Sequence, residues 1–172
     1  MFHRHRTDHD VARLFDLHHA SLYRYLVRLC GEPDLATDAA QEAFVRAVEH
    51  TGAREIERAW LFSVGTNVVL ESRRTDARRT RLLAHGGARA PLADPPPDPH
   101  GALEAEEQRR IVRAALDTLS EKERIAVLMR EEGFAHREIA AAIGTTTGSI
   151  GTLIARALSK LATTLDTVRE QT

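Results

Sequence analysis

Five of the six prolines lie between residues 91 and 99, just after a pair of adjacent glycines at 86 and 87. Proline lacks an amide proton and fixes φ, so neither a helix nor a central strand can run through this stretch. Elsewhere the chain is rich in Ala, Leu, Arg and Glu, which favour helices. The cluster predicts an all-α chain with two small helical domains, residues 1–83 and 103–172, joined by a flexible Pro-rich linker over 84–102.

Apolar residues recur at helical spacing in the first domain and predict three helices. The first is expected to stop at Gly31, where a helix-breaking Pro33 follows closely. Asp34 is expected to cap the second, whose apolar face is built mainly from alanines. The third starts near Trp60 and turns strongly basic toward its end.

The second domain has the layout of a helix-turn-helix. Ser120 and Glu123 match a capping box, and later a short helix ends at Gly144 before a longer one begins between Thr147 and Ser149. No acidic residue occurs from 139 to 165, so the longer helix can approach phosphates without repulsion. On spacing alone, a plain helical hairpin from a bundle is the alternative. The expected DNA-facing residues are Thr147, Ser149, Thr152 and Arg156, with Lys160 further along.

A cluster of arginines ends the third helix of the first domain. Because the formal net charge is −1, any DNA contact has to come from such local clusters. An aromatic ring beside a basic stripe suits single-stranded nucleic acid, since bases stack on rings while Arg holds phosphates, and Trp60 lies upstream on this helix. A solvated basic helix end and a core tryptophan are the alternatives. The candidate arginines are Arg73, Arg74, Arg78 and Arg79.

Three further polar residues, Asp38, Gln41 and Glu42, are expected on the second helix, on the face opposite its alanines. A solvated acidic face is the ordinary explanation for such a group.

Signatures of catalysis or metal binding are not found in the sequence. The single cysteine, Cys30, lies in an apolar helical stretch and is expected to be a buried small hydrophobe. Neither a Gly-rich phosphate loop, nor a nucleophile elbow, nor a pair of catalytic carboxylates occurs. We therefore expect no catalytic residue, metal site or cofactor, and hence no enzyme. The polar start and the lack of a long apolar run predict a cytoplasmic protein without membrane insertion.

Three segments in order resemble the extracytoplasmic-function (ECF) branch of the bacterial sigma-70 family. Residues 34–47, DLATDAAQEAFVRA, are similar to that family's polymerase-binding helix. Residues 59–67, AWLFSVGTN, with the arginines that follow, resemble its promoter-melting and minus-ten segment. The stretch 119–157, which includes LSEKER and REIAAAIG, resembles its minus-thirty-five reader.

The resemblance implies a sigma factor that brings core RNA polymerase to promoter DNA and that an anti-sigma factor restrains. The three polar residues of the second helix would contact polymerase. Asn67, Arg74 and Arg78 would lie near the minus-ten DNA, and the helix from Ser149 would enter the major groove upstream. A stand-alone helix-turn-helix regulator is the alternative, since such a protein binds duplex DNA without polymerase.

Two departures from the family pattern concern the helix-turn-helix. Members often carry Lys or Arg where this chain has Gly151. We therefore expect upstream recognition to rely on DNA shape and phosphate contacts, with modest base discrimination and with Arg156 on the backbone. Ala135 stands where a capping Ser is usual, which predicts a frayed start to the shorter helix.

Limited proteolysis tests the predicted domain boundaries. Protease should cut first between Ala84 and His100 and leave two resistant helical fragments, because few contacts should cross such a linker. Mass spectrometry of the early fragments identifies the sites. First cuts inside 11–50 or 117–160 would contradict the boundaries.

Overall fold

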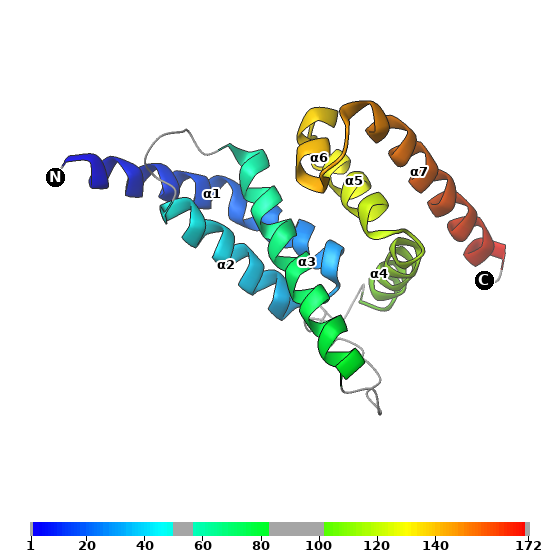
Figure 1. Ribbon diagram of the computed structural model, residues 1–172. Helices are drawn as coiled ribbons and strands as arrows, with labels where there is room; N and C mark the ends of the chain where they lie inside the picture. Colours follow the sequence, from blue (N-terminus) through cyan, green and yellow to red (C-terminus); the bar gives the residue numbers. More distant parts are fainter. Residues whose placement is uncertain (1, 50–56, 83–101, 171–172) are drawn as a thin grey trace. The chain divides into compact units, whose positions relative to one another are not determined.

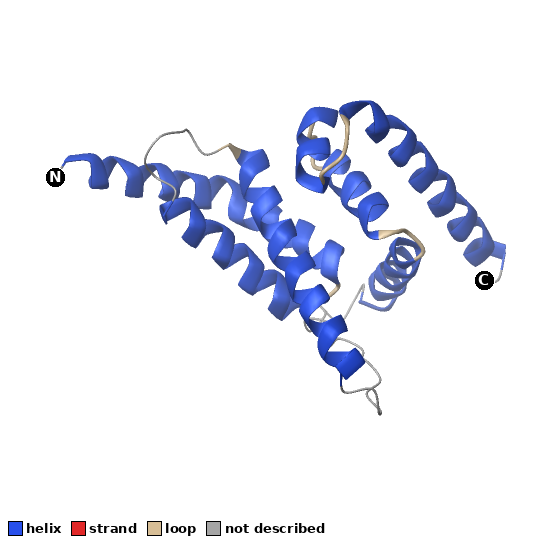
Figure 2. Ribbon diagram, in the orientation of Figure 1, coloured by secondary structure: helices blue, strands red, loops and turns tan. Residues whose placement is uncertain are grey.

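The computed structural model describes residues 2–49, 57–82 and 102–170, and within these ranges all regular structure is helical (Figures 1 and 2). The predicted all-α class is confirmed. The chain divides into two compact units, residues 1–92 and 93–172, while nearly all of the predicted linker lies outside the described residues. The helices are α1 (Phe2–Cys30), α2 (Pro33–Glu49), α3 (Arg58–Leu82), α4 (Ala102–Asp117), α5 (Glu121–Glu131), α6 (His136–Ile143) and α7 (Thr147–Glu170).

The first unit is a three-helix bundle in which α1, α2 and α3 each pack against the other two. Small residues let the helices approach closely: α2 presents fully buried alanines, and a Cβ added at Gly65 of α3 would lie only 3.2 Å from Leu26 Cδ1. The largest side chains of the core come from α1 and α3. They are Leu22, Tyr25, Leu26 and Leu29 from α1, with Leu61, Phe62 and Val69 from α3.

A hydrogen bond crosses this apolar core. The Tyr25 hydroxyl lies 2.8 Å from Thr66 Oγ1, and both residues are fully buried. The Thr66 hydroxyl also lies 2.7 Å from the Phe62 carbonyl oxygen, one turn earlier in α3. Because each hydroxyl has a partner, the pair links α1 to α3 without leaving a buried polar group unsatisfied.

The turn between α1 and α2 shows one correct and one wrong prediction. α1 ends at Cys30 and Gly31 follows with φ of 72°, the left-handed conformation that glycine adopts without strain. However, α2 begins at Pro33, so Asp34 lies inside the first turn and is not the N-cap. Proline suits the first helical position because its missing N–H would have no helical partner there, and an acid in the first turn suits the helix dipole.

The second unit contains the predicted helix-turn-helix, α6 and α7, supported by α5. Gly144 adopts φ of 62° at the end of α6, and α7 begins at Thr147, within the predicted range for its start. Ile139 of α6 and Ile150 of α7 are fully buried, together with Ile125 of α5. The two helices of the motif pack against each other and against α5.

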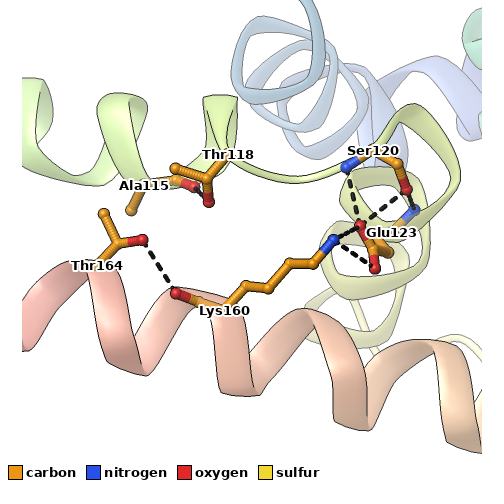
Figure 3. Close-up of polar contacts among 6 residues, drawn as sticks. All are labelled: Ala115, Thr118, Ser120, Glu123, Lys160 and Thr164. Carbon is orange, nitrogen blue, oxygen red and sulfur yellow. Dashed lines mark hydrogen bonds and ion pairs between the residues drawn. The ribbon is translucent and has the colours of Figure 1, made fainter.

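A buried carboxylate joins α5 to α7 (Figure 3). Glu123 accepts hydrogen bonds from the Ser120 amide at 2.9 Å and the Ser120 hydroxyl at 2.8 Å, and the reciprocal bond completes the predicted capping box. The Lys160 ammonium donates to both Glu123 carboxylate oxygens, at 2.8 and 3.0 Å. Only 3% of the Glu123 side chain is exposed. Lys160 first, and then Ser120, lower the pKa of Glu123 from 4.5 to about 2.

Replacing Lys160 by Met tests this junction. The variant keeps the aliphatic stem but leaves a buried carboxylate without its cation, so it should lower the free energy of unfolding at pH 7 by about 1–3 kcal/mol; the half-exposed lysine keeps the loss moderate. Arg110→Ala, which breaks a pair exposed on both sides, should change stability little. Chemical denaturation measures both.

The ion pair between Glu123 and Lys160 should also make the stability of the second unit depend on pH. The pKa of Glu123 is lower in the folded state, so the pair stabilises fully above pH 4.5 and loses its contribution as the pH falls from 4.5 toward 2. The stability difference between wild type and Lys160→Met should shrink across that window. A constant difference would show that the ion pair is not its source.

Candidate functional site

The exposed face of α2 carries the predicted polar residues. Asp38 and Gln41 are exposed and Glu42 is half-buried, while the alanines of the opposite face are buried, as predicted. Glu42 accepts a hydrogen bond from Arg46 at 2.7 Å, with both side chains more than 40% exposed. Such a solvent-exposed pair is weak, so it holds the carboxylate only loosely.

An open apolar groove of about 580 Å³ runs between α1 and α2 beside this polar face, and Gln41 lines it. Phe15 and Val45, also part of its lining, are 44% and 51% exposed, which is unusual for large apolar side chains. The centroids of the Phe15 and Phe44 rings lie 5.0 Å apart, and both residues line the groove. An exposed apolar patch rimmed by polar residues is typical of protein-contact surfaces.

Helical spacing in the sequence does not indicate this groove. Val45 and Val48 lie on α2 outside the alanine face, and both are exposed together with Phe15 of α1. The sequence does show that α2 has apolar residues, Val45 and Val48, in addition to the alanines that fill the core. Whether these extra apolar residues are buried or line a groove depends on how α1 packs against α2, and helical spacing does not show that packing.

Along α3, one exposed stripe brings together several predicted residues. Asn67, Arg74 and Arg78 are exposed at helical spacing, and the half-buried Trp60 lies two turns before Asn67 on the same side. Phe62, in contrast, is fully buried against Tyr25, with the Arg58 guanidinium 4.7 Å from its ring centre. We call Trp60, Asn67, Arg74 and Arg78 the α3 stripe.

Arg73 has a different position from its neighbours. Its guanidinium donates to the carbonyl oxygens of Leu29 and Cys30, at 3.2 and 3.0 Å, at the end of α1. The last carbonyls of a helix have no helical donor and carry partial negative charge, so an arginine satisfies them well. A DNA contact by Arg73 stays a prediction, and this geometry favours a structural role. The Arg79 side chain lies outside the described residues.

The α1 end also contains Cys30. Burial raises the pKa of the Cys30 thiol, and the thiol donates to the Glu32 carbonyl oxygen at 3.2 Å. Only 4% of the residue is exposed, in agreement with the expected buried small hydrophobe.

The outer face of the helix-turn-helix presents short side chains. Thr147, Ser149, Thr152 and Arg156 are exposed, as predicted, and the Ser149 hydroxyl lies 2.7 Å from that of Thr146. Lys160 is held by Glu123, so a DNA contact by its ammonium stays a prediction that this pairing does not favour.

The start of α6 is not frayed. The Glu138 carboxylate accepts the Ala135 amide at 2.6 Å, although Ala135 offers no capping side chain. The helix begins at His136.

Two negative findings apply to the described part of the chain. No group of three or more His, Cys, Asp or Glu side chains lies in a metal-binding arrangement there. Likewise, no helix in it has the length and apolar character needed to cross a bilayer.

Comparisons with known proteins agree with the division of the chain into two units. Residues 14–79 match the family model for sigma-70 region 2, and residues 109–161 match that for sigma-70 region 4. The ECF RNA polymerase sigma factor SigL of Mycobacterium tuberculosis is 31% identical over 158 residues, which cover 88% of this chain and 86% of that protein. The ECF RNA polymerase sigma factor EcfG of Rhodopseudomonas palustris is 32% identical, with coverage of 84% and 79%.

A solved structure shows the same fold. The sigma factor RpoE of Bartonella quintana, crystallised with the anti-sigma factor NepR, aligns with a TM-score of 0.74 at 23% identity. The alignment covers 91% of this chain and 97% of that one.

Arg73→Ala and Arg74→Ala separate the two kinds of arginine on α3. Loss of Arg73 leaves the half-buried carbonyls at the end of α1 without their donor and should lower the free energy of unfolding by about 1–3 kcal/mol. The exposed Arg74 should be replaceable without loss of stability. Thermal denaturation followed by circular dichroism measures both, and equal stability of the two variants would contradict the structural role of Arg73.

Proposed function

The chain belongs to the ECF family of RNA polymerase sigma factors, which direct promoter recognition and transcription initiation, and we propose that its exposed surfaces divide this work. The α2 face with its groove binds core polymerase. The α3 stripe holds the opened minus-ten DNA, and α7 reads the upstream duplex. In this account the chain performs no covalent chemistry and works in the cytoplasm, where polymerase and promoter meet.

The observation that carries the polymerase assignment is the pairing of an acidic face with an exposed groove. Asp38 and Glu42 supply negative charge, and the groove beside Gln41 supplies apolar surface. Charged groups set the orientation and rate of docking, while burial of apolar area stabilises the complex. If this face served only to contact solvent, the exposure of Phe15 and Val45 beside it would have no explanation; a protein contact explains both features.

The α3 stripe suits single-stranded DNA. Arg74 and Arg78 can neutralise phosphates, and Trp60 offers an aromatic edge two turns before Asn67, whose amide can both donate and accept. Arg73 is best left out of this surface because it is engaged at the end of α1.

The amino-terminal end of α7 suits the major groove. No acid occurs between 139 and 165, and the first backbone amides of a helix attract phosphate. Thr152 and Ser149 can donate to bases or phosphates, and the exposed Arg156 further along suits the backbone.

We also propose an anti-sigma factor as a partner. The Bartonella quintana relative was crystallised with such a protein, and the groove between α1 and α2 offers apolar area on which a restraining partner can compete with polymerase.

Charge reversal on α2 tests the polymerase assignment. The double variant Asp38→Lys, Glu42→Lys should weaken binding to purified core polymerase by roughly tenfold or more, because the surface then repels its partner, while the domain stays folded. Glu121→Lys, an exposed acid on the second unit, is the control for altered charge and should bind normally. Affinity is measured with labelled chain by fluorescence anisotropy. Wild-type affinity in the double variant would rule this surface out.

A further inference from the structure

The imidazole of His136 lies beside Gly151, on the outer surface of the helix-turn-helix. A Cβ atom added at Gly151 would lie 3.9 Å from His136 Cε1, an ordinary van der Waals distance. Both residues are exposed. His136 belongs to α6 and Gly151 to α7, so a side chain from the first helix of the motif lies next to the position where the second helix has no side chain.

The neighbouring positions of α7 are also short. Gly148, Thr152 and Ala155 are exposed and share the outward side of the helix. A Cβ at Gly148 would meet no atom within 4 Å, so the space in front of this glycine is open. Gly148 and Ala155 offer no hydrogen-bonding side chain on this side of α7, so a base edge beyond the reach of Thr152 would need a longer donor or acceptor from elsewhere.

An imidazole has the right chemistry for that reading. In its neutral form one ring nitrogen donates and the other accepts, and in its charged form both donate. The major-groove edge of guanine presents two acceptors, and that of adenine presents an acceptor and a donor. A single imidazole can therefore distinguish base pairs by one hydrogen bond.

We propose that His136 is a specificity-determining residue that reads a base edge of the upstream duplex in place of the side chain absent at position 151. The proposal rests on the proposed entry of α7 into the major groove. It adds to the expectation that recognition relies on shape and phosphate contacts with modest base discrimination: the base contact is supplied by α6, across the motif.

The test is polymerase-dependent transcription from a promoter library with a randomised upstream element. The His136→Ala variant should show a base preference reduced about fivefold at one or two adjacent base pairs, and unchanged preferences at the other positions. Arg137→Ala, the exposed neighbour on α6, is the matched control and should leave every base preference unchanged, whatever it does to the yield. Circular dichroism confirms that both variants fold.

A second pair of variants uses the contact itself. Gly151→Ala adds only a methyl group at ordinary contact distance and should keep the wild-type preference. Gly151→Arg places a long side chain against the imidazole and should change the preference at the same base pairs. Its effect should differ in the His136→Ala background, because residues in contact are not additive.

The outcomes distinguish a failure of the role of His136 from a failure of the proposed function. A wild-type chain that transcribes, with His136→Ala either unchanged or weakened equally on all sequences, overturns the role of His136 alone. A wild-type chain without promoter-dependent transcription overturns the proposed function and the role of His136 with it.

Discussion

The Glu123 carboxylate lies buried between α5 and α7, where it completes the cap of α5 and binds the Lys160 ammonium of α7. A buried carboxylate is costly unless it is paired and hydrogen-bonded, so this arrangement allows α7 few positions against α5. The orientation of α7 sets which of its residues face outward. The direction of the proposed DNA surface therefore depends on a contact made about ten residues further along the same helix.

The first unit uses a related device. There Arg73 of α3 donates to the last carbonyls of α1, where no helical donor remains. In both units a long basic side chain, Arg73 or Lys160, joins two helices. The exposed residues on the outer faces of α3 and α7 stay available to a partner. Lys160 and Arg73 thus position the surfaces that we assign to nucleic acid, and neither needs to touch DNA for those surfaces to work.

Local signals in the sequence predicted the ends of α1 and α6 and the start of α5, because each depends on residues a few positions apart. They were wrong at two helix starts, since Asp34 does not cap α2 and the start of α6 is not frayed. Gly31 and Gly144 have the positive φ that a helix end requires, and Ser120 caps α5 with Glu123. The contacts of Lys160 and Arg73 could not be predicted from spacing because their partners are distant in sequence: Glu123 lies 37 positions from Lys160, and Leu29 lies 44 from Arg73. A DNA contact by either residue stays a prediction. The groove could not be predicted for the same reason, since it exists only where α1 meets α2. The contact of His136 with Gly151 likewise depends on the angle between two helices.

The central claim is that this chain gives core polymerase its choice of promoter. In vitro transcription with purified core polymerase on a library of genomic fragments measures this directly. The account predicts that discrete start sites appear only when the chain is added, and that they share two DNA elements at a fixed spacing. Starts that do not depend on the chain, or a chain that binds duplex DNA alone and gives core polymerase no new starts, would contradict it.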